Sequence, residues 1–310
     1  MKTLVSINIL NFNTYEKSKT CIESCLQQKG IAYTIVLIDN HSTDGSYEKL
    51  RQEYTGKIEF LYNDENYGFA KGNNIGIRYC RKLGVRYSLL LNSDTELKGD
   101  YLLKSMLETI TTVKDCAIVA PKIYTVTHHG FMLQPNDSDY LKLLRIGGVI
   151  PKNKTVPLGF RTLSVAHGSA LFVDNDKFIE IGGFPEHYFM YCEELTFAKK
   201  ILWNNYLICE NTNKEEYVLH HHDKTDQVAS WRLFLMGRNL SLEFLENNSS
   251  KKIVWSIVFY LYYLKQFLIG LLKSDQHFYK GMKEGGKLYR RSASKKECFQ
   301  QALLIKENYK

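Results

Sequence analysis

Two acidic residues at the end of an apolar segment are the first candidates for chemistry in this chain. Residues 87–97 read YSLLLNSDTEL, so an apolar run stops at Asn92 and is followed by Asp94 and Glu96. Short polar residues of this kind are typical of a turn or of a helix N-cap. Carboxylates at the carboxyl end of a strand are also suitable ligands for a divalent cation that binds a diphosphate. This segment by itself leaves both interpretations open.

The elements that would position these acids alternate between strand and helix over the first 120 residues. Short apolar runs rich in β-branched residues are separated by stretches with helical spacing. This alternation predicts an α/β fold, with a mostly parallel sheet flanked by helices. The expected strands are Val5–Leu10, Tyr33–Ile38, Ile58–Tyr62, Tyr87–Leu91 and Ala117–Ala120, and the expected helices are 15–27, 45–53, 69–82 and 100–113.

Polar residues and glycines follow four of these strands. Ligands of such sheets bind beyond the carboxyl ends of the strands, so the four segments would line one polar crevice. They cover residues 11–14, 39–46, 63–74 and 92–96. Any one of them taken singly is also an ordinary turn.

The chain after residue 120 gives weaker signals. Glycines and prolines interrupt residues 121–165, which predicts loops and a hairpin. A strand is expected within 166–174, a helix over 193–203, a strand over 217–220 that runs into three histidines, and a helix over 228–246.

The charge of the chain is concentrated at one end. The net charge is +8, of which residues 251–310 carry +9 and the preceding 250 residues carry −1. Residues 253–272 are apolar enough to span a bilayer, to form a buried helix or dimer contact, or to lie in the membrane interface. Their many aromatic residues and flanking lysines favour the interfacial helix. Because this tail combines apolar mass with charge, it predicts an anionic membrane surface as partner rather than nucleic acid.

The cysteines and the N-terminus indicate the compartment. Seven cysteines contain no CxxC pair, which argues against a zinc site and favours reduced thiols in a cytosolic protein. The N-terminal residues lack the apolar run and cleavage site of a secretory signal. We therefore expect a cytoplasmic protein, held peripherally on the inner face of the cell membrane.

Several motifs, taken in order, resemble one family. SINILNFNT, IVLIDNHSTDGS, NYGFAKGNNIGI and SLLLNSDTEL are similar to the nucleotide-sugar half of the inverting glycosyltransferases of family 2, which have the GT-A fold. GGFPEHYFMYCEELTFAKKI, YVLHHHDKT and GRNLSLEF resemble that family's acceptor, histidine and Arg-Asn segments. The similarity is greatest to rhamnosyltransferase-like members that build bacterial surface polysaccharides. It implies a GT-A domain over 1–248, divided into a donor half (1–120) and an acceptor half (121–248), before a basic helical tail over 249–310.

The resemblance implies a nucleoside-diphosphate sugar as donor, with dTDP or UDP as the nucleotide, and Mg²⁺ or Mn²⁺ as cofactor. Asp94 matches the last acid of the family's D-x-D motif and would be a metal ligand, while Asn92 replaces the first acid. The Asp39 carboxylate would accept a hydrogen bond from the base. The full set implied for the nucleotide-sugar is Asn11, Asn13, Asp39, Asn40, Gly68, Phe69, Ala70, Asn73, Asn92 and Ser93.

The resemblance also assigns catalytic roles to the acid pair in YCEEL. Glu194 would be the base that deprotonates the acceptor hydroxyl, and Glu193 its orienting neighbour. The family usually has Glu-Asp here, so Glu194 departs from the pattern by one methylene. Two acids that open a helix also suit its macrodipole, which is an alternative reason for their presence.

Three further side chains complete the implied site. His220 matches the family's histidine and would complete the metal site, and alternation along a strand places His222 on the same side. His222 and Arg238 would contact a phosphate or the acceptor, although Arg238 could instead hold its helix to the body.

The whole set implies transfer of a sugar, with rhamnose from dTDP-rhamnose as the leading donor, to a polyprenyl-linked oligosaccharide or polysaccharide acceptor. The alternatives are another UDP- or dTDP-sugar, a nucleotidyltransferase, and a non-catalytic assembly protein with a similar fold. The Asn-Phe-Asn-Thr sequence after the first strand argues against a nucleotidyltransferase, which would have a glycine-rich basic loop there.

Overall fold

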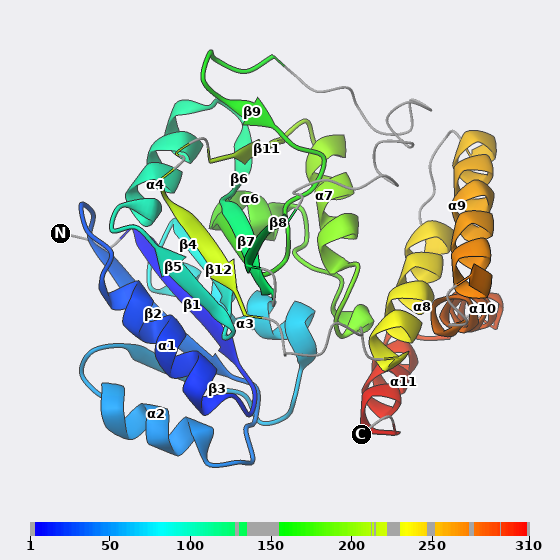
Figure 1. Ribbon diagram of the computed structural model, residues 1–310, viewed down its shortest axis with the longest axis horizontal. Coiled ribbons are helices and arrows are strands. Elements are labelled where there is room, and N and C mark those ends of the chain that lie inside the picture. Colours follow the sequence, from blue (N-terminus) through cyan, green and yellow to red (C-terminus); the bar gives the residue numbers. More distant parts are fainter. Residues whose placement is uncertain are drawn as a thin grey trace.

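The computed structural model describes residues 4–127, 130–134, 155–211, 213, 215–221, 230–246, 252–272, 276–291 and 293–308. Its body is a central sheet covered by helices on both faces, beside a bundle formed by the C-terminal helices (Figure 1). The α/β prediction is confirmed.

The central sheet has the order β3-β2-β1-β4-β10-β6-β11-β9. Strands β1 to β4 are mutually parallel, and β6 is parallel to β11, while β10 is antiparallel to both of its neighbours. The bounds are β1 (Val5–Asn11), β2 (Tyr33–Asp39), β3 (Glu59–Tyr62), β4 (Tyr87–Asn92), β6 (Cys116–Ala120), β9 (Arg161–Thr162), β10 (Ala170–Asp174) and β11 (Leu207–Glu210). The five strands predicted in the first 120 residues are present, and β11 was not predicted.

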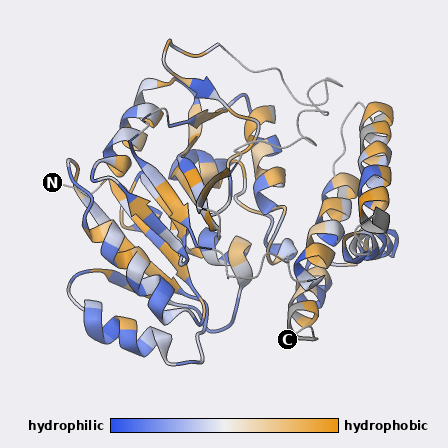
Figure 2. Ribbon diagram, viewed as in Figure 1, coloured by the Kyte–Doolittle hydropathy of each residue, from blue (hydrophilic) through white to orange (hydrophobic). Residues whose placement is uncertain are grey.

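Two apolar layers explain why both faces of this sheet are covered. Along β10, Leu171 and Val173 point into the core beneath α3, α6 and α7, and Ala170 and Phe172 into the core beneath α1, α2 and α4. This alternation is the two-residue period of a strand buried on both faces. The helices are α1 (Tyr15–Leu26), α2 (Ser46–Tyr54), α3 (Gly68–Lys82), α4 (Leu102–Thr112), α6 (Asn175–Glu180), the 3₁₀ turn η1 (Glu186–Tyr188) and α7 (Glu193–Trp203). Figure 2 shows the apolar strands between these helices.

A smaller second sheet brings distant parts of the chain together. Its order is β5-β12-β7-β8, with bounds β5 (Thr95–Lys98), β7 (Lys122–Thr127), β8 (Gly130–Gln134) and β12 (Tyr217–His220). Strand β5 begins immediately after the turn that contains Asp94, and Thr95 lies opposite His220 in the antiparallel ladder. No helix therefore starts at Asp94, and the N-cap interpretation of that residue is wrong. The hairpin expected within 121–165 is β7–β8.

The C-terminal helices are α8 (Ser230–Glu246), α9 (Lys252–Leu272), α10 (His277–Arg290) and α11 (Lys295–Asn308). Helices α8 and α10 are almost in backbone contact. A Cβ atom added to Gly237 would lie 2.0 Å from the Phe278 carbonyl oxygen, and one added to Gly281 would lie 2.0 Å from the Phe234 carbonyl oxygen. Glycine permits this approach because it has no side chain to separate the helices. Helix α8, which precedes the predicted domain boundary at residue 248, thus packs on α10, which follows it, and the boundary itself stays a prediction.

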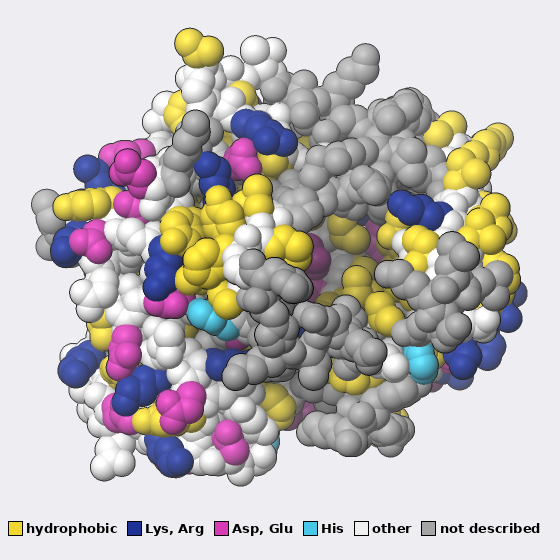
Figure 3. Space-filling view, in the orientation of Figure 1, with side chains coloured by type: hydrophobic (Ala, Val, Ile, Leu, Met, Phe, Trp, Pro, Cys, Tyr) yellow, Lys and Arg dark blue, Asp and Glu magenta, His cyan; other side chains and the backbone are white. Residues whose placement is uncertain are grey.

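Helix α9 packs on the bundle through the face that carries Phe259. Phe244 of α8 stacks on Phe259 at 3.8 Å between ring centroids. The opposite face is apolar and exposed. Figure 3 shows its hydrophobic side chains at the right edge of the molecule, where Figure 1 places α9. It consists of Ile253, Ile257, Tyr260, Leu261, Leu264 and Leu268. Among the described residues, no helix is long and apolar enough to cross a membrane.

Candidate functional site

The carboxyl ends of β1 and β2 are joined by a buried polar network. Asn11 Nδ2 donates to Asp39 Oδ2 at 2.6 Å and to Ser42 Oγ at 3.1 Å, and Asn11 Oδ1 accepts from the hydroxyls of Thr14 and Ser18. Both Asn11 and Asp39 are fully buried. Since all of Asn11's hydrogen-bonding groups are engaged, its role in this structure is to fix the Asp39 carboxylate.

The loop after β2 is held by that same carboxylate. The Ser42 amide donates to Asp39 Oδ1 at 2.8 Å, and the Ser42 hydroxyl donates to Oδ2 at 2.7 Å. Asn13 stabilises the loop from the other side, because its Oδ1 accepts from the Thr43 amide at 2.8 Å. A carboxylate accepts about four hydrogen bonds, so Asp39 retains capacity for one from a nucleobase.

The N-terminus of α3 is connected to the acceptor half of the chain. The amides of Phe69 and Ala70 both donate to the Phe189 carbonyl oxygen, at 2.8 and 3.3 Å. Gly68 has φ +67°, and a Cβ there would lie 2.4 Å from the same oxygen, so only glycine fits. Asn40 supports this turn by donating to the Gly68 carbonyl at 2.9 Å.

Asn73 has an unsatisfied acceptor. Its Nδ2 donates to the Phe69 carbonyl at 3.0 Å, while its buried Oδ1 has no hydrogen-bond partner among the described residues. A buried acceptor without a hydrogen-bond partner costs free energy, and a hydroxyl of the sugar donor would satisfy it.

Asp94 and His220 meet at the edge of the second sheet. His220 Nε2 lies 3.3 Å from Asp94 Oδ1, and the amide of the next histidine, His221, donates to the Asp94 carbonyl at 2.8 Å. Ser93 Oγ lies 2.9 Å from Thr14 Oγ1, within hydrogen-bond distance, which ties this turn to the end of β1. Asn92 is half-buried beside it.

Glu96 points into a separate ion-pair network. It contacts Lys98 and lies 3.2 Å from His221 Nε2. Burial opposes its ionisation, but hydrogen bonds from Lys98 and His221 prevail and lower the pKa of Glu96. Glu96 lies within β5 and pairs with cations of the second sheet, so it is a strand residue and its interpretation as a turn residue is wrong.

His167 was missed by the sequence reasoning. Its ring lies 5.7 Å from that of His220, in a T-shaped arrangement. The Ser169 amide donates to His167 Nδ1 at 3.2 Å, so in the neutral ring the proton sits on Nε2. The only signal in the sequence was the polar AHGS segment immediately before an apolar strand.

The two adjacent glutamates face different surroundings. A methyl group placed on Gly168 would lie 4.0 Å from Glu194 Cδ and 3.7 Å from the ring of Phe69, so Glu194 is next to the donor-side loop. Glu193 is 4% exposed, and its Oε2 has no hydrogen-bond partner among the described residues. Burial raises the pKa of Glu194, and burial together with the neighbouring charge of Glu194 raises the pKa of Glu193 further.

Asp94 and His220 can bind a divalent cation only if the substrate supplies further ligands. The part of the chain that the structure describes has no group of three or more His, Cys, Asp or Glu side chains arranged to hold a metal. Mg²⁺ and similar ions are commonly held by one or two protein ligands plus phosphate oxygens and water. One carboxylate and one imidazole suit that mode.

Arg238 does not lie at this site. Its side chain is fully buried, with Nε donating to Gln301 Oε1 at 3.1 Å and a second nitrogen donating to the Cys298 carbonyl. The structure corrects the predicted phosphate or acceptor contact, because the guanidinium is buried and holds α8 to α11. The alternative role placed its partner in the body, whereas α11 belongs to the C-terminal bundle. His222, predicted to contact a phosphate or the acceptor, lies outside the described residues.

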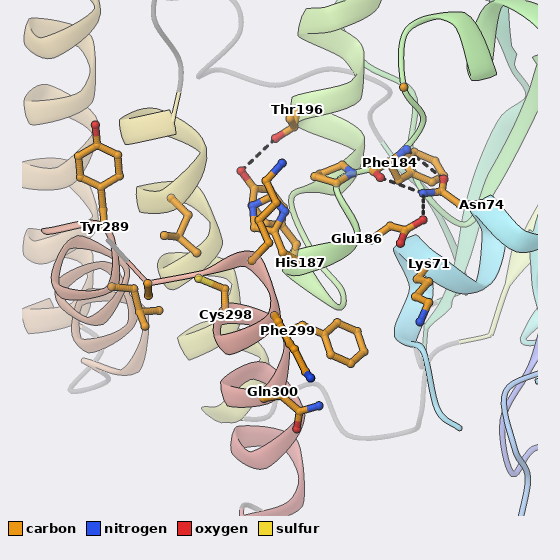
Figure 4. Close-up of a pocket in the computed structure, with 18 of the residues that line it drawn as sticks. Lys71, Asn74, Phe184, Glu186, His187, Thr196, Tyr289, Cys298, Phe299 and Gln300 are labelled. Carbon is orange, nitrogen blue, oxygen red and sulfur yellow. Dashed lines mark hydrogen bonds between the residues drawn. The ribbon is translucent and has the colours of Figure 1, made fainter. Parts of the chain in front are cut away.

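A separate cavity of about 1320 Å³ lies between the body and the C-terminal helices. Figure 4 shows Thr196 and His187 on one wall and Phe299 on another. None of the described residues that line it was placed by the sequence analysis in the nucleotide-sugar, metal or catalytic site. The candidate site is therefore the strand-end crevice.

The comparisons with known proteins agree with this geometry. The model of glycosyl transferase family 2 matches residues 6–176, which is more than half of the chain. The chain belongs to glycosyltransferase family 2. The matched segment contains most of β1, all of β2 to β4, α3 and the Asp94 turn, which are the elements that line the strand-end crevice.

Two curated relatives cover much of the glycosyltransferase. The low-salt glycan biosynthesis hexosyltransferase Agl10 of Haloferax volcanii is 28% identical over 251 residues, which cover 79% of this chain and 76% of that protein. The rhamnosyltransferase WbbL of Escherichia coli K12 is 25% identical over 179 residues, which cover 54% and 66%.

Solved structures of other glycosyltransferases share the fold. GalNAc-T7, crystallised with UDP, GalNAc and Mn²⁺, has a TM-score of 0.59 at 15% identity and covers 77% of this chain, which spans only 48% of GalNAc-T7. TarS of S. aureus in complex with UDP has a TM-score of 0.54 at 16% identity and covers 82% of this chain and 69% of that one. The glycosyltransferase therefore has the GT-A fold, as predicted.

Proposed function

We propose that this glycosyltransferase moves a sugar from a dTDP- or UDP-sugar, with inversion at the anomeric carbon, to a polyprenyl-linked or polysaccharide acceptor in cell-surface glycan synthesis. The observation that carries the proposal is the continuity of the crevice. Asp94 meets His220, His220 meets His167, and the adjoining Gly168 lies between Glu194 and the donor-side loop. Rhamnose is the leading donor sugar, supported by the similarity to a rhamnosyltransferase.

The nucleotide would bind along the carboxyl ends of β1 and β2. Asp39, fixed by Asn11, would accept a hydrogen bond from the ring N–H of uracil or thymine. The Gly68 turn would let the backbone approach the nucleotide, and Asn73 Oδ1 would accept from the donor. This assignment favours dTDP or UDP because both bases have such an N–H.

Asp94 and His220 would hold Mg²⁺ or Mn²⁺ together with the oxygens of the diphosphate. When bound, the ion supplies positive charge to the departing nucleoside diphosphate. The GalNAc-T7 structure contains Mn²⁺ with UDP, which supports the same class of cofactor here. His167 would donate its Nε2 proton to a diphosphate oxygen.

Glu194 would act as the general base. It would accept the proton of the acceptor hydroxyl while that oxygen bonds to the anomeric carbon and the bond from this carbon to the diphosphate oxygen breaks. The raised pKa of Glu194 makes its ionised form a stronger proton acceptor than an exposed carboxylate. Glu193, which points into the protein, would position the start of α7.

The C-terminal helices would hold the enzyme on the inner, anionic surface of the cell membrane. The exposed face of α9 is apolar, and basic residues follow it on α10, directly after α10 and at the start of α11. A helix of this kind lies in the interface plane, where apolar burial and attraction to anionic lipid act together. The basic residues are Lys280, Lys283, Lys287, Arg290, Arg291, Lys295 and Lys296.

The function is tested by measuring transfer with a panel of dTDP-, UDP- and GDP-sugars in the presence of Mn²⁺. The cognate donor is expected to raise the melting temperature selectively, since only binding to the folded state stabilises it. NMR of the product should show the anomeric configuration opposite to that of the donor. Retention of configuration would reject the single-displacement mechanism. Nucleotide transfer to a sugar phosphate would favour a nucleotidyltransferase, and binding of no donor would favour a non-catalytic assembly protein.

A further inference from the structure

The loop that leads into the catalytic acids has an unusual backbone. Phe189, Tyr191 and Cys192 have φ angles of +69°, +72° and +68°. At Phe189, ψ is −62°, and the Met190 amide donates to the Tyr188 carbonyl at 2.9 Å, which together form a γ-turn of the strained kind. Each left-handed residue other than glycine costs about 1–2 kcal/mol. Such a loop persists only where surrounding contacts hold it.

Asn239 of α8 supplies those contacts. Its side-chain Nδ2 lies 2.8 Å from the Met190 carbonyl oxygen, 2.9 Å from that of Tyr191 and 3.2 Å from that of Tyr188. The side chain is fully buried, so water does not compete for these carbonyls. One amide group therefore binds three backbone oxygens across the strained turn.

The same loop touches both halves of the site. On one side, the Phe189 carbonyl receives the amides of Phe69 and Ala70 at the start of α3. On the other side, Cys192 is followed directly by Glu193 and Glu194. A shift of this turn would therefore move the donor-side loop and the acids relative to each other.

Asn239 is itself anchored by the C-terminal helix. Its Oδ1 accepts from Arg238, which in turn donates to Gln301 and to the Cys298 carbonyl of α11. Phe299 of α11 also packs against Phe189 at 5.6 Å between ring centroids. Helix α11 thus supports the turn in two ways: directly through Phe299, and indirectly through Arg238 and Asn239 of α8.

We propose that Asn239 is a positioning residue for sugar transfer, and that it sets the geometry of the acid pair against the donor loop from a frame completed by α11. The inference rests on the proposed function, in which Glu194 takes the acceptor's proton. A displacement of about 1 Å at such a site lowers the rate of transfer by about 100-fold. A residue that merely stabilised α8 would lower stability without this selective effect on rate.

The test compares Asn239→Leu with Ser241→Ala. Ser241 is the matched control, because it lies on the same helix, is buried, and donates one hydrogen bond to a backbone carbonyl, that of Met282 at 2.9 Å. Each variant is assayed for kcat, for KM of donor and acceptor, and for hydrogen exchange over residues 186–194. We expect Asn239→Leu to lower kcat about 100-fold, with a donor KM within threefold of wild type and faster exchange in that segment. Ser241→Ala should change neither.

Three outcomes decide the proposal. Loss of kcat and faster exchange in Asn239→Leu alone support it. Normal kcat in Asn239→Leu overturns it, as does an equal loss in both variants. If the leucine variant does not fold, Asn239→Asp, whose carboxylate would face the same three carbonyl oxygens, carries the same comparison. Glu194→Gln is assayed in parallel. Full activity of that variant would reject Glu194 as the base, and the hydrogen-exchange result would then still test whether Asn239 holds the turn.

Discussion

His220 Nε2 lies 3.3 Å from Asp94 Oδ1 because the antiparallel pairing of β12 with β5 places His220 opposite Thr95. The two side chains are thereby fixed at the end of β4 without depending on a flexible loop. This pair is the basis of the first prediction.

Asp94→Asn is expected to lower kcat by about 100- to 1,000-fold, because it removes the carboxylate that we propose as ligand of a cation beside the diphosphate. The loss should be measured over a Mn²⁺ titration, in which the variant requires more metal for half-maximal activity. Glu96→Gln is the matched control, since Glu96 pairs with Lys98 and His221 outside the crevice. Equal losses in the two variants would contradict the assignment of Asp94.

The acid pair predicts two opposite pH effects. Since the pKa of Glu194 is raised, its ionised form accumulates only as pH rises through that raised value, and kcat should rise with it. Stability should change in the other direction. Because the pKa of Glu193 is raised in the folded state, Glu193 contributes to the stability of the fold. This contribution is present in full below the ordinary pKa of 4.5, and it is lost as pH rises through the raised pKa of the folded state.

Glu193→Gln is therefore expected to stabilise the protein, and more so at pH 8 than at pH 5, because the amide is neutral at both. Each pKa unit of the shift corresponds to about 1.4 kcal/mol. Thermal melts of wild type and variant at the two pH values measure the difference. A gain that is identical at both values would mean that Glu193 titrates normally.

Gly68→Ala is expected to weaken donor binding and to destabilise the fold by about 2–5 kcal/mol, since the backbone strain adds to the clash with the Phe189 carbonyl. Gly45→Ala is the control. Gly45 has φ +79° with nothing within 4 Å of an added Cβ, so only the strain of about 1–2 kcal/mol should remain. Denaturant unfolding and donor titration report the two effects. A Gly68→Ala variant no less stable than Gly45→Ala would show that the contact is not tight.

A buried ion pair holds α7 to α8. Lys199 of α7 contacts Glu243, and both side chains are fully buried. Glu243→Gln should destabilise the protein by about 3–5 kcal/mol, because it leaves the buried ammonium without its counter-charge. The double variant Lys199→Met with Glu243→Leu should recover most of that loss in a denaturant titration. Failure of the double variant to recover would indicate that packing, rather than charge, dominates at this position.

The exposed face of α9 predicts binding to anionic vesicles. Leu261 and Leu264 are 58% and 52% exposed, and changing both to Asp should reduce vesicle partitioning by tenfold or more, since each buried leucine contributes about 1.5–3 kcal/mol. Leu83→Asp is the control, because Leu83 is 49% exposed at the end of α3 in the body. Vesicle flotation measures the effect. Unchanged flotation of the α9 variant would reject the membrane surface as its partner.

Local sequence patterns determined the donor half. The apolar runs of β1 to β4 and the helical spacing between them are local signals, and parallel strands in such a sheet deliver their polar ends to one edge. The crevice that contains Asn11, Asp39 and Asp94 was therefore predictable, because its residues lie at the ends of strands that the pattern already marks.

Tertiary structure alone decided which distant residues complete that crevice. Pairing of β12 with β5 brings His220 to Asp94, and the antiparallel entry of β10 brings His167 beside it. The contacts of Arg238 and Asn239 were likewise decided by the tertiary structure. The two residues are adjacent in the chain, but the Arg238 side chain contacts α11 and the Asn239 side chain contacts the strained turn. Sequence fixes which groups are available, whereas register and helix packing fix which of them meet, since those contacts join segments far apart in the chain.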